Sequence, residues 1–207
     1  MDKKPNRKDP GGVSRRDFIK GLGTGALGTA VLPPLLGQAI ATQKGRVPVY
    51  GKKTISLTVN GKKIDLAVEA NETLLDALRD RLDLTGAKKV CDRGECGGCT
   101  VLLDGVPVYA CMTLAVRADG KTVKTVEGLA RNGKLHPVQE AFIEKDGYQC
   151  GFCTPGFLMT TSAFLEKNPA PSLDEIKQAL SGNLCRCGNY AKIYGAVDAA
   201  AKKLKGA

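Results

Sequence analysis

The chain has 207 residues, 43% of them apolar and 25% charged, which is typical of a globular protein with one domain or two small ones. Its formal net charge of +10 would suit a nucleic-acid partner, but only 5% of the residues are aromatic and none is tryptophan, so little is available for stacking on bases. Eight cysteines are many for this length, and they fall into two groups of four along the chain.

Residues 1–41 have the pattern of an export signal. Arg15 and Arg16 precede a weakly apolar run at 21–36, and residues 39–41 (Ala-Ile-Ala) offer a small-x-small cleavage site. The paired arginines resemble the twin-arginine signal, an address read by a receptor that exports folded proteins. We therefore expect a periplasmic protein that receives its cofactors before export.

The same run is a poor membrane span. It is rich in glycine and broken by Pro33-Pro34, whereas a span needs about 20 mainly apolar residues. We expect no stable membrane anchor and a mature chain beginning at Thr42. An uncleaved anchor and a disordered basic tail remain the alternatives.

After a linker at 42–53, residues 54–127 predict a small α+β domain. Alternating apolar residues on both sides of Asn60-Gly61 predict a first hairpin, and Asp104-Gly105 predicts a second one. Between them, Asn71 is expected to cap a helix over 72–82. Further strands are expected at 100–103, 106–110 and 121–126.

The first four cysteines lie inside this domain. The spacing C-x4-C-x2-C, followed by a fourth cysteine, is the plant-type ligand set of a [2Fe–2S] cluster. Gly94, Gly97 and Gly98 would let the loop curl around the metal, because glycine tolerates positive φ and close approach. The candidate ligands are Cys91, Cys96, Cys99 and Cys111. A zinc site is the alternative, although zinc sites usually show C-x2-C pairs.

Residues 128–207 predict a second, helical domain. Helices are expected near Pro137, over 155–166, from a capping box at Ser172 to about Leu180, and over 190–204. The predicted fold class is therefore α+β, with a β-sheet domain followed by a four-helix domain.

The second group of cysteines lies in the helical domain, at Cys150, Cys153, Cys185 and Cys187. Cys150 and Cys153 can share one turn near a helix start. Residues two apart on a helix point about 200° from each other, so Cys185 and Cys187 must lie in a loop to share a metal. A four-cysteine zinc site would also fit this spacing. Disulfides are a further alternative in an exported chain, but they do not need C-x4-C-x2-C or C-x-C geometry.

The two groups together, with the segments 149–156 (QCGFCTPG) and 182–188 (GNLCRCG), resemble the small iron–sulfur subunit of molybdenum hydroxylases, the relatives of xanthine dehydrogenase and aldehyde oxidoreductase. The resemblance covers nearly all of residues 54–204, and with the twin-arginine pattern it is nearest to a periplasmic aldehyde oxidoreductase. It implies a β-grasp domain of the plant-type ferredoxin kind and a helical domain, each with one [2Fe–2S] cluster.

The resemblance also implies partners. A large subunit with molybdopterin–molybdenum would oxidise an aldehyde or an N-heterocycle, and a subunit with FAD, or an external acceptor, would receive the electrons. The helical group would lie nearer molybdenum, with Gln149 in contact with the pterin. The chain would thus be an electron-transfer subunit of an oxidoreductase, without catalytic residues of its own. Two anionic clusters would also lower the net charge of the mature chain to about +2, which removes the basis for a nucleic-acid partner.

Two alternative functions remain open: a free-standing two-cluster ferredoxin that serves several enzymes, and a zinc or disulfide scaffold. His136 is the single histidine and is expected in a loop or at a helix start rather than as a ligand. A Rieske centre needs two histidines and is excluded. No nucleophile–base pair or nucleotide-binding glycine loop is present.

Overall fold

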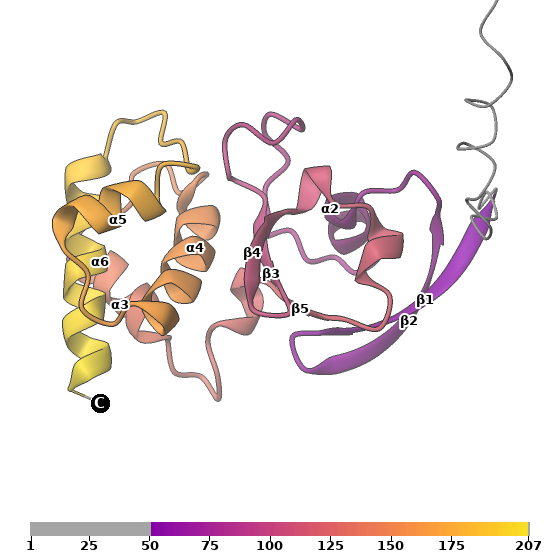
Figure 1. Ribbon diagram of the computed structural model, residues 1–207, viewed down its shortest axis with the longest axis horizontal. Coiled ribbons are helices and arrows are strands. Elements are labelled where there is room, and N and C mark those ends of the chain that lie inside the picture. The colour runs from indigo at the N-terminus through magenta and orange to yellow at the C-terminus, as the bar shows by residue number, and fades with distance from the viewer. Residues whose placement is uncertain (1–50, 207) are drawn as a thin grey trace, which may run out of the picture. The chain divides into compact units, whose positions relative to one another are not determined.

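A computed structural model describes residues 51–206 (Figure 1). The expected export signal and nearly all of the expected linker lie outside the described residues. The part of the chain that is described belongs to one compact unit. It contains a β-sheet in its first half and a group of helices in its second half, so the predicted α+β fold class is confirmed.

The sheet is mixed and has the strand order β2-β1-β5-β3-β4. Its strands are β1 (Lys52–Val59), β2 (Lys62–Glu69), β3 (Thr100–Leu103), β4 (Val106–Tyr109) and β5 (Thr122–Lys124). β1 and β5 run parallel in the centre, and the other neighbours are antiparallel. Both predicted hairpins are present, since each turn has an Asn or Asp and a Gly at positive φ, as a two-residue type I′ turn requires. β5 is shorter than predicted.

The helix predicted over 72–82 forms differently. It begins as α2 (Leu74–Asp76) and continues as a π-helical turn at Ala77–Arg81. The cap is Thr73, whose hydroxyl accepts the Asp76 N–H at 3.1 Å, so the prediction that Asn71 caps the helix was wrong.

The physical reason is a tertiary pairing. The Ala115 N–H donates to the Glu72 carbonyl at 2.9 Å, and the Leu74 N–H donates to the Thr113 carbonyl at 2.7 Å. These bonds hold the chain extended through Thr73, so the helix cannot start earlier.

The second half contains four α-helices within the described range: α3 (Pro137–Glu144), α4 (Thr154–Lys167), α5 (Leu173–Ala179) and α6 (Tyr190–Lys205). The predicted capping box at Ser172 is confirmed, with its hydroxyl accepting the Glu175 N–H. His136 stands at a helix start as predicted: it is the N-cap of α3, and its Nδ1 accepts the Val138 N–H at 3.3 Å.

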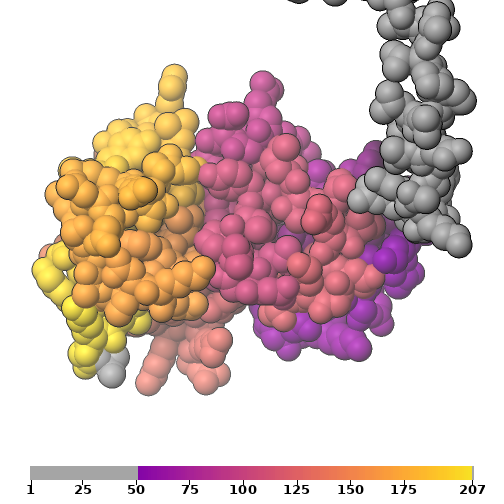
Figure 2. All heavy atoms as spheres, viewed as in Figure 1, coloured from indigo at the N-terminus to yellow at the C-terminus, as the bar shows by residue number. Residues whose placement is uncertain are grey.

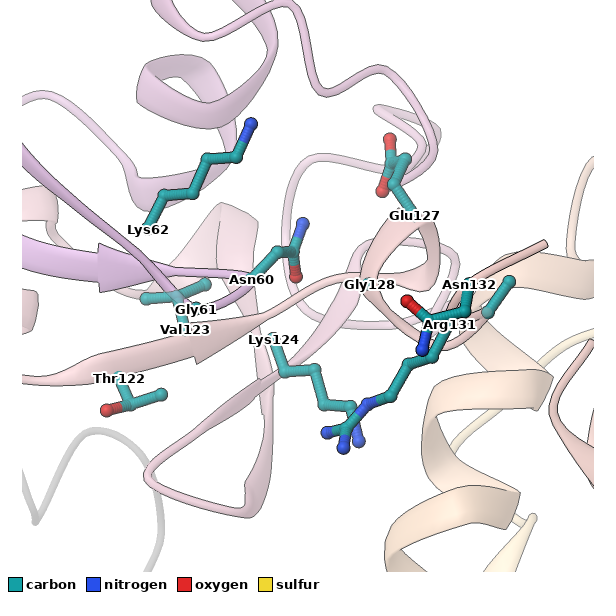
Figure 3. Close-up of a pocket in the computed structure, with 11 residues that line it drawn as sticks. Asn60, Gly61, Lys62, Thr122, Val123, Lys124, Glu127, Gly128, Arg131 and Asn132 are labelled. Carbon is teal, nitrogen blue, oxygen red and sulfur yellow. The ribbon is translucent and has the colours of Figure 1, made fainter. Parts of the chain in front are cut away.

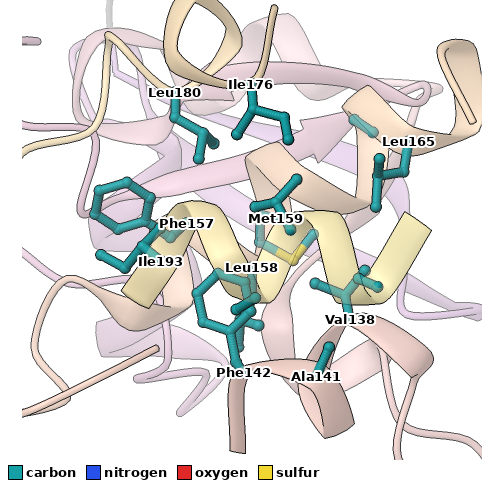
Figure 4. Close-up of a cluster of buried hydrophobic side chains, with 14 of the residues drawn as sticks. Val138, Ala141, Phe142, Phe157, Leu158, Met159, Leu165, Ile176, Leu180 and Ile193 are labelled. Atoms are coloured by element: carbon teal, nitrogen blue, oxygen red, sulfur yellow. The ribbon is translucent and has the colours of Figure 1, made fainter. Parts of the chain in front are cut away.

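Strand β3 joins the two halves because its side chains alternate between two faces. Val101 is buried in the core between the sheet and α2. Leu102 points the other way, into the core of the helices. That helical core is built around Phe142, Phe157 and other apolar side chains (Figure 4). In Figure 2 the helices, in orange and yellow, lie directly against the sheet half.

Candidate metal centres

The first four cysteines converge at one end of the sheet. Cys91, Cys96 and Cys99 lie in the loop that leads into β3, and Cys111 lies in a 3₁₀ turn directly after β4. The hairpin of β3 and β4 thus brings residues twelve apart together, with Cys99 Sγ and Cys111 Sγ 3.4 Å from each other. The Cys96 side chain is close enough to Cys91 to contribute to lowering the pKa of its thiol.

Backbone N–H groups stabilise a thiolate in this loop. Those of Arg93 and Glu95 point at the sulfur of Cys91 and lower the pKa of its thiol to about 6. The Glu95 N–H lies 3.4 Å from Cys91 Sγ. Burial has the opposite effect on Cys99, where it raises the pKa to about 12. A buried group of thiolates therefore needs a positive charge in its midst, which a metal supplies.

The glycines of the loop act in two ways. Gly94 (φ +78°) and Gly97 (φ +67°) have the left-handed backbone conformation that the sequence predicts. Gly98 does not have a positive φ. A Cβ there would make a tight contact of 3.1 Å with Val90 Cγ2, the end of an exposed side chain.

The second four cysteines converge at the ends of helices. Cys153 is the N-cap of α4, with Cys150 just before it, and Cys185 and Cys187 lie in the loop between α5 and α6, as predicted. Cys150 Sγ and Cys187 Sγ are 3.6 Å apart, and the Cys185 side chain is close enough to Cys153 to contribute to raising the pKa of its thiol. Burial raises the pKa of Cys153 to about 12, whereas the Phe152 N–H lowers the pKa of Cys150.

The thiols are arranged as pairs. All eight cysteines are free, and sulfurs 3.4 and 3.6 Å apart are too distant for a disulfide, whose S–S bond is about 2.05 Å. Two thiolates on one tetrahedral metal, each with a bond of about 2.3 Å, lie about 3.8 Å from each other. Two pairs in each group suit a binuclear centre with two ligands for each iron.

The donor set therefore fits [2Fe–2S] centres. The pairs would be Cys91 with Cys96, Cys99 with Cys111, Cys150 with Cys187 and Cys153 with Cys185. Thr154, next to Cys153, has a buried hydroxyl without a hydrogen-bond partner, as expected where a bound group would complete the shell.

The two groups are joined through the backbone. The Leu184 N–H donates to the Cys96 carbonyl at 2.9 Å, and Leu184 is covalently bonded to Cys185. Close by, the Tyr109 hydroxyl donates to the Gly182 carbonyl at 2.9 Å. A single hydrogen bond therefore connects a cysteine of the first group to the neighbour of a cysteine of the second.

Comparisons with known proteins agree with this geometry. Residues 57–130 match the model of a 2Fe-2S iron-sulfur cluster binding domain, and residues 125–198 match the model of a [2Fe-2S] binding domain. The chain is 41% identical over 208 residues to the aldehyde oxidoreductase iron-sulfur-binding subunit PaoA of Escherichia coli K12, with 93% of this chain and 90% of PaoA covered.

The chain belongs to the small iron–sulfur subunits of molybdenum hydroxylases.

Other small subunits are similar over the described part. The nicotine 6-hydroxylase small subunit of Paenarthrobacter nicotinovorans is 51% identical over 143 residues, which cover 69% of this chain and 86% of that one. The crystal structure of quinoline 2-oxidoreductase from Pseudomonas putida 86 has a chain 46% identical, with a TM-score of 0.72 and coverage of 75% of this chain and 97% of that one.

Some solved structures contain a similar segment within a much longer chain. The aldehyde oxidoreductase from Desulfovibrio gigas is 41% identical with a TM-score of 0.71, and the match covers 74% of this small subunit but only 17% of that chain. An equivalent of this small subunit is therefore one segment of a much longer polypeptide there.

Gln149 lies beside the second group in the small subunit. It is exposed, and its Nε2 is 3.5 Å from Asn189 Oδ1, which leaves most of the side chain open to a partner. Its contact with a pterin stays a prediction.

A hollow of about 670 Å³ lies between the β1–β2 turn and the segment after β5, and no cysteine lines it. Lys62 points away from Lys124 and Arg131, whose side chains extend toward the same place in Figure 3. Between residues 51 and 206, no helix is both long enough and apolar enough to cross a membrane.

The spacing of the cysteines along the chain predicted the metal ligands, but it did not predict the residues that join the two groups. Tyr109 and Asn183 are of this kind. Neither carries a signal in the sequence, because their partners, Gly182 and Gly97, are more than seventy residues away.

Proposed function

We propose that this chain is the electron-transfer subunit of an exported molybdenum hydroxylase that oxidises aldehydes. The observation that carries the proposal is the hydrogen bond between Cys96 and Leu184, which joins two groups of four thiols into one path. When bound, each [2Fe–2S] centre supplies a carrier for one electron at a time. The residues of this chain hold the two centres, space them and shield them from water.

The burial of the cysteines suggests a direction for the path. Cys96, Cys99, Cys111 and Cys185 are buried, whereas Cys150 and Cys187 are exposed. Large apolar side chains beside them are also open to solvent, with Phe152 52% and Leu184 53% exposed. Exposed apolar residues around a site mark a surface for a partner. We assign this surface to the large molybdenum subunit, with Gln149 at its edge in contact with the pterin.

The first group then passes electrons outward. Cys91 is partly exposed, and Met112, directly after Cys111, is 64% exposed. A subunit with FAD, or an external acceptor, would approach this side.

Substitution of single cysteines in the assembled enzyme tests this order. After an aldehyde is added under anaerobic conditions, rapid-freeze EPR follows the reduction of each centre separately. Cys96→Ser should leave the reduction of the helical-domain centre intact and stop electrons from leaving. Cys187→Ser should prevent the reduction of both centres. The opposite pattern would reverse the order, and a small subunit that is a stable monomer in extracts would favour a free-standing ferredoxin.

The choice of an aldehyde is supported by the PaoA comparison, which also extends beyond the described residues. Residues 51–207 make up about three quarters of the chain, so a match over 93% of it includes part of the first 50 residues. That relative is a subunit of an aldehyde oxidoreductase. We propose that Arg15 and Arg16 direct the folded protein to the periplasm. Replacing both with lysine should move the protein from the periplasmic to the cytoplasmic fraction; an unchanged periplasmic fraction would contradict export by the twin-arginine route.

A further inference from the structure

One buried carboxamide connects the loops of both cysteine groups. Asn183 is 5% exposed, and both ends of its side chain are hydrogen-bonded. Its Nδ2 donates to the Gly97 carbonyl at 3.1 Å, and its Oδ1 accepts the Thr160 hydroxyl at 2.9 Å. Its own backbone N–H donates to the Leu180 carbonyl at 2.9 Å.

Asn183 and its two side-chain partners belong to three different segments, each of which carries cysteines. Gly97 follows Cys96 in the first loop, Thr160 lies in α4 two turns after Cys153, and Asn183 itself stands two residues before Cys185. We propose that Asn183 is a positioning residue that fixes the distance between the two four-cysteine groups. This inference rests on the ligand assignment in the proposed function.

The carboxamide is tightly packed on the side that faces Gly97 and Gly156. A Cβ at Gly97 would lie 2.5 Å from Asn183 Nδ2, and a Cβ at Gly156 would lie 2.2 Å from the Gly97 carbonyl oxygen. Loop, carboxamide and helix therefore touch at the closest distance that two glycines allow. In such a site, a side chain that no longer donates to Gly97 would push the two loops apart.

Asn183→Asp is the sharpest change. It keeps an oxygen for Thr160 but replaces the donor to Gly97 with a second acceptor, so two oxygens would face each other in a buried place. Asn189→Asp is the matched control. Asn189 is 7% exposed, its Nδ2 donates to the Asp146 carbonyl at 2.8 Å and its Oδ1 accepts from Gln149 Nε2 at 3.5 Å, so these contacts stay within the helical half.

Pulsed EPR of the two reduced centres in the assembled enzyme measures their dipolar coupling, which falls with the cube of their distance. We expect Asn183→Asp to weaken the coupling and Asn189→Asp to keep the wild-type value, with iron content and both separate signals unchanged. Wild-type coupling in Asn183→Asp at full iron content would overturn the proposal.

Should Asn183→Asp fail to hold its metal, Thr160→Val decides, because it removes only the bond that orients the carboxamide. A weaker coupling in Thr160→Val supports the proposal, and an unchanged one overturns it. Iron analysis of the wild type separates a failure of the ligand assignment from a failure of the positioning role. A wild type that lacks either centre contradicts the ligand assignment, whereas two centres without measurable coupling contradict the positioning.

Discussion

The contact between Gly97 and Gly156 should control the stability of the whole unit. Gly97 lies in the loop of the first cysteine group and Gly156 lies in the first turn of α4. A Cβ on Gly156 would come within 2.2 Å of the Gly97 carbonyl oxygen, and a Cβ on Gly97 would come within 2.5 Å of the Gly182 carbonyl oxygen. Both contacts are to backbone atoms, which cannot rotate out of the way.

The loss of stability expected for Gly97→Ala has two parts, one from backbone conformation and one from overpacking. Its φ of +67° costs an L-residue about 1–2 kcal/mol. The overpacking costs a further amount of about 1–3 kcal/mol, so the free energy of unfolding should fall by about 2–5 kcal/mol. Gly120 is the matched control, because it has a φ of +73° with nothing within 4 Å of a Cβ. Gly120→Ala should therefore lose only about 1–2 kcal/mol.

Urea unfolding followed by circular dichroism under anaerobic conditions compares the two variants. With a denaturant dependence of about 2 kcal/mol per M, Gly97→Ala should unfold at a midpoint about 0.5–1.5 M lower than Gly120→Ala. Gly156→Ala should also destabilise, although alanine is the better helix former. Equal midpoints for Gly97→Ala and Gly120→Ala, or a stabilised Gly156→Ala, would refute the close packing of α4 on the first cysteine loop.

Three further changes test separate contacts by the same unfolding measurement. Thr73→Ala removes the cap of α2 and should cost about 1 kcal/mol, whereas Asn71→Ala should cost much less; the reverse would contradict the observed cap. Tyr109→Phe removes the bond to Gly182 and should cost about 0.5–1.5 kcal/mol, and no loss would show that this bond is unimportant. Burial, followed by the positive charge of Lys124, lowers the pKa of His136 below its usual 6.5. The unfolded state therefore binds more protons than the folded state, and the free energy of unfolding should fall as pH drops below about 6.5. His136→Asn keeps a cap without titrating and should reduce this pH dependence; an unchanged dependence would contradict the assignment.

Local sequence signals predicted the hairpins, the helices and the places of the cysteines. Asn60-Gly61 and Asp104-Gly105 determine their turns by themselves, and so does the capping box at Ser172. The start of α2 was missed because it depends on Thr113 and Ala115, some forty residues away, whose backbone holds the chain extended through Thr73.

The same limit applies to the site. The spacing of the cysteines indicated two groups of ligands, because a metal requires its ligands close together. It could not indicate that Asn183 and Leu184 would contact the first loop, since that contact arises only when α4 packs on β3. Nor could it show that Gly97 needs both positive φ and space, whereas Gly98 has an ordinary φ.

The central claim is that the two groups of four cysteines hold two [2Fe–2S] centres in a small subunit of a molybdenum hydroxylase. The most direct measurement is iron and acid-labile sulfide for each chain, with EPR of the reduced protein purified from its native host. We expect two irons and two labile sulfides for each group of four cysteines, and two distinct EPR signals. Zinc in either group, or a single EPR signal with half of the iron, would contradict the account.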